Sequence, residues 1–375
     1  MRITNLQIDI FGGIVMHHTV HMFYKFDYQY YSAIFTILQE ICLDSHRIFF
    51  KDTDKSWQFH LLKDKGLLLI LRHNEYSEGI SYHALEIIMN PMRLLQEDDY
   101  YNLAESKYSK QIYKEFKRAF TPIRKKFKSK KSNKNLIFKF DNLDIYSFKR
   151  IDFAINICTD YVDLYMKLIK RADIPNGFQL YAPYDNISRR SKPPEDSFYI
   201  FRRSTSKGNH VTLTINCYKK GVQMIDNALP EHELSAKTIR FEVQCRYSKV
   251  YSIIRSNGLS KQGYSQFLDE VISTKVLDTY IKKTIGYGDY YTLPKAKSIV
   301  EGTKLKLETK NALITTLEQV NEKRSIWKAK EASADQKKFI KSIKKLHEIG
   351  INPVTIPIAE KVDYLSCFFD INNQI

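Results

Sequence analysis

The sequence is poor in the features that mark secreted and membrane proteins. Its five cysteines are scattered, with no C-x-x-C pair and no zinc-ligand spacing, so we expect free thiols, a reducing compartment and no structural zinc. The longest apolar run, Gly66 to Leu71, is far shorter than the roughly 20 residues that a membrane-spanning helix needs. The first residues include Arg2 and Asp9 and lack a signal-type cleavage site. We therefore expect a cytoplasmic protein that does not enter a membrane.

Acidic residues are also in short supply. The chain has 42 Asp and Glu against 59 Lys and Arg, which gives a formal net charge of +17 and a pI of about 9.4. A soluble protein with this excess repels itself and commonly binds a polyanion. DNA, RNA and an anionic membrane surface all fit the charge, and so does a general bias of composition toward lysine. The 375 residues, 43% of them hydrophobic, exclude a disordered chain and suffice for two domains.

Apolar runs bounded by turn signals predict a strand-rich part up to about residue 259. The predicted strands are 65–73, 82–91, 136–143, 149–157, 197–202, 210–220 and 238–247. Helices are expected over 94–120 and 159–172. Beyond residue 259 the apolar period becomes 3.6, and it predicts helices over 264–284, 308–330 and 334–349. The expected fold is α+β: an antiparallel sheet core with helices on one face, followed by a basic helical C-terminal region.

Between Lys107 and Lys134 the charge is almost wholly positive, with Glu115 as the one acid. The segment ends in KKFKSKKSNK (125–134), which predicts an exposed basic loop between two strand-rich halves. It is either a solvated loop or a direct contact for phosphates. The side chains that we assign to such contacts are Lys125, Lys126, Lys130 and Lys131, together with two strand arginines, Arg150 and Arg240.

Three of the predicted strands carry functional side chains on one face, because successive residues of a strand point to opposite sides. In the strand at 149–157 this face carries Arg150 and Asp152, and in the strand at 238–247 it carries Arg240 and Glu242. In the strand at 210–220 the corresponding positions include Tyr218 and Lys220, and Glu86 can join the same face from the strand at 82–91. If these strands share one sheet, the side chains converge. The alternative is an ordinary sheet with one solvated face, on which the Arg-x-acid pairs form salt bridges.

Converging carboxylates, a tyrosine and a lysine suit phosphoryl transfer. Oxygen ligands favour Mg²⁺ or Mn²⁺, which polarise a phosphoryl oxygen. A phenol held near such an ion can attack phosphorus and form a phosphotyrosine ester, while a lysine stabilises the charge on the phosphate. The segment HHTVH, with His17, His18 and His21, lacks the usual His-hydrophobic-His spacing, and we expect a plain surface or core role for it rather than a metal site.

At these same residues the chain resembles a known family. The Arg-Ile-Asp strand, the Tyr-x-Lys strand end and the Arg-Phe-Glu strand occur in the order and approximate spacing of the gene II family. These are replication endonucleases of filamentous phages that also occur on plasmids and mobile elements of Gram-positive bacteria. The segment HALEIIMNPMRLLQ is similar to the Glu-Ile…Pro segment of that family, and HEIGINPVTIP is similar to the end of its Gram-positive members. The resemblance covers roughly residues 65–260.

The resemblance implies a rolling-circle replication initiator that nicks its origin, stays bound to the 5′ phosphate and rejoins the strand. It implies Tyr218 as nucleophile, Lys220 as its neighbour, and Asp152 and Glu242 as ligands of Mg²⁺ or Mn²⁺. One departure is Gln223, where family members often have glutamate, so Glu86 or His83 would have to complete the metal site. Residues 1–259 would then form the nicking domain and 260–375 a DNA-binding or accessory domain. Origin DNA and host replication proteins such as a helicase are the implied partners.

Two other functions remain open from the sequence. A relaxase of a conjugative or mobilisable element would use the same chemistry for strand transfer. A non-catalytic DNA-binding initiator or repressor would use the polar face only to bind phosphate. A binder shifts supercoiled origin DNA in a gel without nicking it, whereas an enzyme converts it to open circles.

Overall fold

The computed structural model describes residues 16–75, 81–181, 197–204 and 210–368. Within this part the chain is α+β with a large sheet whose strand order is β2-β3-β4-β5-β1-β6-β10-β9-β8-β7. The pairs with assigned register are antiparallel, as predicted. The chain divides into two compact units, and the divisions fall inside two strands of this sheet. One unit comprises Val15–Ala154 and Gln244–Thr274, and the other includes Ile155–Val243 and Lys275–Ile375; we call them the N-terminal and C-terminal units.

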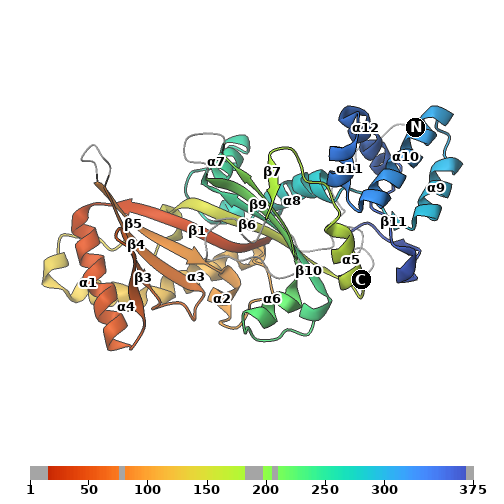
Figure 1. The fold of residues 1–375 in the computed structure, drawn as a ribbon. Coiled ribbons are helices and arrows are strands. Elements are labelled where there is room, and N and C mark those ends of the chain that lie inside the picture. Colours follow the sequence, from red (N-terminus) through yellow and green to blue (C-terminus); the bar gives the residue numbers. More distant parts are fainter. Residues whose placement is uncertain (1–15, 76–80, 182–196, 205–209, 369–375) are drawn as a thin grey trace. The chain divides into compact units, whose positions relative to one another are not determined.

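The N-terminal unit holds one end of the sheet. Its strands are β1 (Met16–Phe26), β2 (Phe49–Thr53), β3 (Ser56–Phe59), β4 (Leu67–Glu75), β5 (Ser81–Met89) and the first part of β6 (Ser147–Cys158). Its helices are α1 (Tyr28–Asp44), α2 (Pro91–Leu95), α3 (Ser109–Ala119), α4 (Thr121–Ser129) and α7 (Tyr247–Ser256). Helices α1 and α4 lie side by side at the β2–β5 end (Figure 1). Helix α2, which the sequence did not predict, begins at Pro91 because Asn90 accepts hydrogen bonds from two backbone N–H groups and Pro91 follows it.

The C-terminal unit contains strands and a group of helices. Its strands are β7 (Phe178–Leu180), β8 (Phe198–Arg203), β9 (Val211–Lys219), most of β10 (Thr238–Arg246), and the short pair β11 (Tyr290–Tyr291) and β12 (Tyr364–Leu365). Its helices are α5 (Val162–Ile169), α6 (Lys220–Asp226), most of α8 (Glu270–Thr284), α9 (Leu293–Gly302), α10 (Leu307–Lys323), α11 (Ile326–Ala332) and α12 (Gln336–Glu348).

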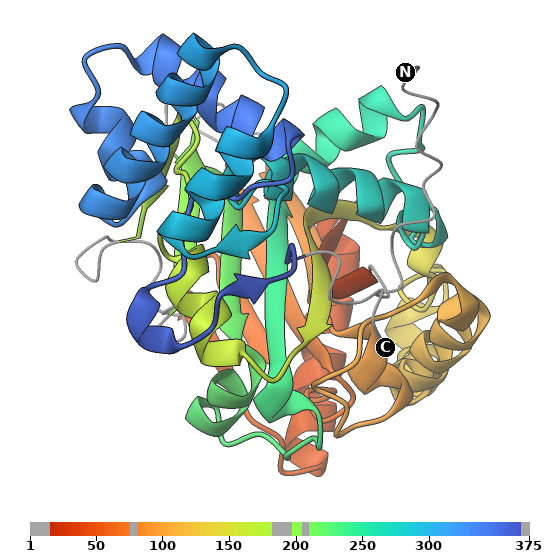
Figure 2. The same cartoon turned by 90° about the vertical axis from the view of Figure 1, so that its right-hand side faces the viewer.

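Helices α9 to α12, drawn in blue, gather into one bundle (Figure 2). Its core is a cluster of buried side chains that includes Leu313, Leu317 and Leu346. These helices belong to the same compact unit as β7 to β9, so in the structure residues 260–375 do not form a unit of their own. No helix in the described part of the chain combines the length and the apolar character that crossing a bilayer requires.

Two predicted elements are wrong. The predicted loop at 125–134 is wrong: the basic segment 107–134 forms α3, α4 and a short 3₁₀ helix, Lys131–Asn133. The apolar residues of the segment 107–134, which include Phe116 and Phe127, recur at helical spacing and are buried. The many lysines between them make this spacing difficult to recognise in the sequence. The segment 136–143 is not a strand, because its phenylalanines pack into an aromatic cluster without pairing to the sheet; Phe140, for example, contacts Phe26 edge-on.

Two predicted helices are shorter than expected. The helix over 308–330 is divided into α10 and α11 at Arg324, which has a left-handed φ of 54°. Between 94 and 120 the chain is helical mainly over α3, because residues 96–105 form turns and irregular backbone. The strands at 65–73, 82–91, 149–157, 197–202, 210–220 and 238–247 and the helices over 159–172, 264–284 and 334–349 are confirmed within a few residues.

Candidate functional site

The predicted site residues lie on β6, β10 and β9, which are consecutive in the sheet. Asp152 has an exposed fraction of 0%, Glu242 of 3% and Tyr218 of 4%. The face that carries them is therefore covered, and the alternative of a solvated face is wrong. Because an ionised carboxylate is costly to bury without partners, each acid here requires a cation or hydrogen-bond donors.

Tyr218 stands next to Glu242. Its hydroxyl donates a hydrogen bond to Oε2 of Glu242 across 3.3 Å. Burial raises the pKa of Tyr218, and the negative charge of Glu242 raises it further, so the free protein holds a neutral phenol. Arg240 acts on the pKa of Tyr218 in the opposite direction, and its Nε donates to Oδ1 of Asn156 at 2.7 Å. Arg240 is fully buried, which favours a role in ordering this group over direct contact with DNA.

Asp152 is held by its neighbour on the same strand. Nε and Nη2 of Arg150 donate to the two oxygens of Asp152 at 2.8 and 2.6 Å. This bidentate pair fixes the orientation of the carboxylate. The salt bridge expected from the Arg-x-acid pattern is therefore present for Asp152. A carboxylate has about four lone-pair sites, and the bonds from Arg150 occupy two of them.

His18 joins the two carboxylates. His18, Asp152 and Glu242 each offer one ligand atom, and these atoms lie within 4.8 Å of one another. The sequence pattern assigned His18 no such role, because strict alternation does not place the HHTVH histidines together. The register of β1 against β6 shifts between His17 and Thr19, and this irregularity breaks the alternation at His18. Two carboxylates suit Mg²⁺ or Mn²⁺, and the imidazole favours Mn²⁺ of the two.

Glu86 is on the predicted face but belongs to another network. Its Oε2 accepts from His21 Nε2 at 2.9 Å, and its Oε1 pairs with Arg72 Nε at 2.6 Å and with Lys149. Burial alone would raise the pKa of Glu86, but the hydrogen bond and charges of its partners lower it to about 2. The ligand group found among the described residues does not include Glu86. These partners favour a structural role for Glu86.

The residues expected to compensate for Gln223 lie elsewhere. Gln223 itself accepts a hydrogen bond from Lys220 Nζ at 2.6 Å, so in this chain it orders the lysine. Lys220 is buried and opens α6, directly after β9. His83 is buried against another histidine: its Nε2 lies 2.6 Å from Nδ1 of His73.

The predicted phosphate contacts on α4 and just after it fall into two classes. Lys125 and Lys131 are exposed. Lys126 and Lys130 instead form ion pairs with α1: Lys130 Nζ lies 2.6 Å from Glu40, and Lys126 Nζ lies 3.1 Å from Asp44. The second class attaches α4 to α1, so the exposed class is the better candidate for binding DNA.

Models of known protein families do not match this chain, and neither do curated proteins. We therefore argue its function from the arrangement of Tyr218, Glu242, Asp152 and His18.

Proposed function

We propose that the chain nicks and rejoins one strand of DNA through a covalent 5′-phosphotyrosine on Tyr218, as a rolling-circle replication initiator. One observation carries the proposal: the hydroxyl of Tyr218 is hydrogen-bonded to Glu242, which itself belongs to a group of metal-ligand side chains. The net charge of +17 fits a DNA substrate.

The chemistry needs a nucleophile, a proton acceptor and stabilisation of negative charge. Tyr218 Oη attacks phosphorus, the bond from phosphorus to the 3′ oxygen breaks, and the 3′ oxygen leaves and takes up a proton. Glu242 accepts the hydrogen bond of the phenol and is the nearest base for its proton. Attack of the same 3′ hydroxyl on the phosphotyrosine reverses these steps and rejoins the strand.

His18, Asp152 and Glu242 would hold Mg²⁺ or Mn²⁺. When bound, such an ion polarises a phosphoryl oxygen and lowers the pKa of a nearby phenol. The ion would thus favour the phenolate form of Tyr218, which burial disfavours in the free protein by raising its pKa. Arg150 orients Asp152, and the buried Lys220 lies directly after the strand that carries Tyr218.

The proposal is tested with a pool of single-stranded oligonucleotides and with supercoiled DNA of the replicon that encodes the chain. Incubation with Mn²⁺ or Mg²⁺ followed by a denaturing gel should show a covalent protein–DNA adduct and open circles. A non-catalytic binder would shift DNA on a native gel but would give neither product. A relaxase would give both products, because it shares the chemistry; the role in replication rests on the resemblance of the sequence.

A further inference from the structure

We propose that a groove in the C-terminal unit binds a segment of single-stranded nucleic acid. The groove lies among β7, β8, the end of α8 and α12, and its volume is about 420 Å³. Pockets of about 300–1,000 Å³ bury drug-sized ligands, so a nucleotide of a longer strand fits in this space. None of Tyr218, Lys220, Glu242, Asp152 and His18 lines it.

Three cations from three different elements line the groove without an acidic partner. They are Arg202 of β8, Lys283 of α8 and Lys344 of α12, and all three are exposed. Within the described residues none of them forms an ion pair, whereas the neighbouring Lys282 is paired with Asp278 at 2.9 Å. Cations that converge from separate elements give a positive potential inside the groove, which attracts phosphates.

The acid in the groove is already neutralised. Asp173 is the one carboxylate among the lining residues that the structure describes. Lys330 Nζ lies 2.5 Å from Oδ1 of Asp173 and also donates to the carbonyl of Ile174 at 3.0 Å. The positive charge of the three exposed cations is therefore not cancelled from within the groove.

Aromatic and aliphatic side chains form the rest of the lining. Phe178 is partly exposed and meets Tyr280 edge-on, with ring centroids 6.3 Å apart. Ile340 and Ile343 of α12 are also partly exposed. Bases of a single strand are free to stack on such surfaces, whereas a duplex hides its base faces. Cations beside a partly exposed ring and aliphatic side chains thus match a strand with accessible bases better than a duplex.

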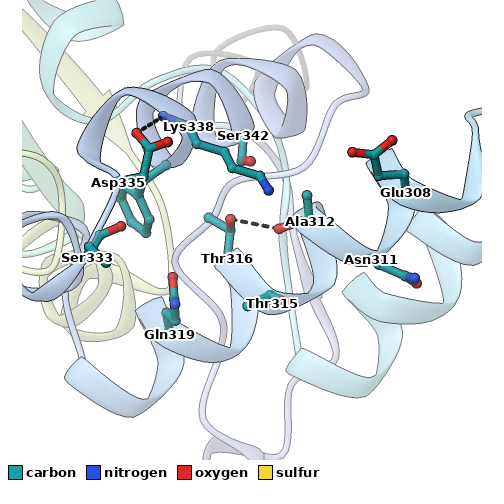
Figure 3. Close-up of a pocket in the computed structure, with 12 residues that line it drawn as sticks. Glu308, Asn311, Ala312, Thr315, Thr316, Gln319, Ser333, Asp335, Lys338 and Ser342 are labelled. Atoms are coloured by element: carbon teal, nitrogen blue, oxygen red, sulfur yellow. Dashed lines mark hydrogen bonds between the residues drawn. The ribbon is translucent and has the colours of Figure 1, made fainter.

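A second hollow on the same helix shows the contrast. It lies between α10 and α12, with a volume of about 410 Å³ (Figure 3). Its lining is mainly small and polar, and its two carboxylates, Glu308 and Asp335, outnumber its one cation, Lys338. A phosphate strand would gain nothing there, so the charge complementarity singles out the groove at Arg202, Lys283 and Lys344.

This inference rests on the proposed function in one respect: a nicking enzyme has to hold a single strand. The test is fluorescence anisotropy of a labelled oligo(dT) with the triple variant Arg202→Ala, Lys283→Ala, Lys344→Ala. We expect at least a tenfold weaker affinity and a salt slope that is less steep by about 0.7 for each phosphate that the variant no longer neutralises. The matched control, Lys304→Ala, Lys337→Ala, Lys341→Ala, removes the same charge from exposed positions outside the groove and should bind nearly as well as the wild type.

Phe178→Ala tests the stacking part separately. Loss of one stacked base should weaken oligo(dT) binding roughly tenfold and leave binding to heparin, a polyanion without bases, unchanged. The inference would be overturned if the groove variant and its control lost the same affinity for oligo(dT). It would also be overturned if the groove variant lost as much affinity for duplex DNA as for oligo(dT). A chain that binds oligo(dT) through this groove but never nicks would refute the proposed function alone. A chain that nicks while the groove variant binds normally would refute the groove alone.

Discussion

The hydroxyl of Tyr218 and the carboxylate of Glu242 form a buried hydrogen bond between two neighbouring strands of the sheet. Glu242 is shared between this bond and the group with His18 and Asp152. The proposed nucleophile, the proposed base and the potential metal ligands are thereby connected through one side chain. Substitutions at single positions should separate these roles.

Tyr218→Phe removes the hydroxyl and keeps the ring. Nicking should fall by more than about a thousandfold, because no other group would supply the attacking oxygen, while DNA binding should persist. Tyr264→Phe is the matched control: this hydroxyl is also buried, and among the described residues it has no hydrogen-bond partner, so its removal should leave both nicking and stability intact. For each variant the nicking rate is measured together with the affinity for DNA, the latter by fluorescence anisotropy of a labelled oligonucleotide.

His18→Ala and Asp152→Asn should each raise the Mn²⁺ concentration needed for half-maximal nicking by at least about tenfold, since each removes a ligand. The effect of His18→Ala should be greater for Mn²⁺ than for Mg²⁺, because imidazole is the better ligand for the transition metal. His210→Ala, at an exposed position, serves as the control. Unchanged metal titrations in both ligand variants would show that the group does not bind the ion.

Glu86→Gln should lower the free energy of unfolding by about 3 kcal/mol, because it leaves Arg72 and Lys149 without their shared carboxylate. Its metal requirement for nicking should stay that of the wild type. A urea melt and a metal titration on the same preparation measure both. If instead the stability is kept and the metal requirement rises, Glu86 is a ligand, as the sequence pattern predicts.

The same network predicts a loss of stability in acid. The pKa of Glu86 is lowered from its ordinary 4.5 to about 2, so its stabilising effect is present above pH 4.5 and is lost as the pH falls toward 2. Burial lowers the pKa of His21 below 6.5; protonation therefore favours the unfolded chain, and stability also falls as the pH drops below 6.5. In Glu86→Gln the loss between pH 4.5 and 2 should be smaller. Urea melts at several pH values measure the free energy of unfolding. An equal loss between pH 4.5 and 2 in the wild type and in Glu86→Gln would contradict this.

The exposed and paired lysines of α4 should behave differently. Lys125→Ala with Lys131→Ala should weaken duplex DNA binding and make the salt slope less steep by about 0.9 for each phosphate left without its lysine. Lys126→Ala with Lys130→Ala removes the same charge but breaks ion pairs with α1, so it should also lower the thermal stability slightly. Salt titrations together with thermal melts distinguish the two. Identical salt slopes in both double variants would show that the exposed positions do not contact DNA.

The sequence predicted the strands of the candidate site well, because β6, β9 and β10 show clean alternation with β-branched and aromatic residues. It placed Asp152, Glu242 and Tyr218 on the polar faces of these strands. Only the structure shows that these side chains are buried. It could not find His18, because the irregularity in β1 depends on pairing with β6, and pairing is a non-local property. It also could not show that Glu86 is neutralised, because Arg72 and Lys149 come from strands far apart in the sequence.

The basic segment was misjudged for a local reason. Lysines dominate the end of the segment 107–134 and suggest a loop at 125–134, but the helical spacing of apolar residues such as Phe116 and Phe127 decides the structure once these rings pack into a core. The groove at Arg202, Lys283 and Lys344 likewise could not be predicted from the sequence, because its cations come from three elements that only the fold brings together.

The central claim is that Tyr218 forms a covalent bond with DNA. The most direct test is to incubate the wild-type chain with single-stranded DNA and Mn²⁺, digest the protein and the DNA, and identify the modified peptide by mass spectrometry. The account predicts a nucleotide joined by its 5′ phosphate to Tyr218, formed only with the metal and absent from Tyr218→Phe. An adduct on another residue, or strand cleavage without any adduct, would contradict it.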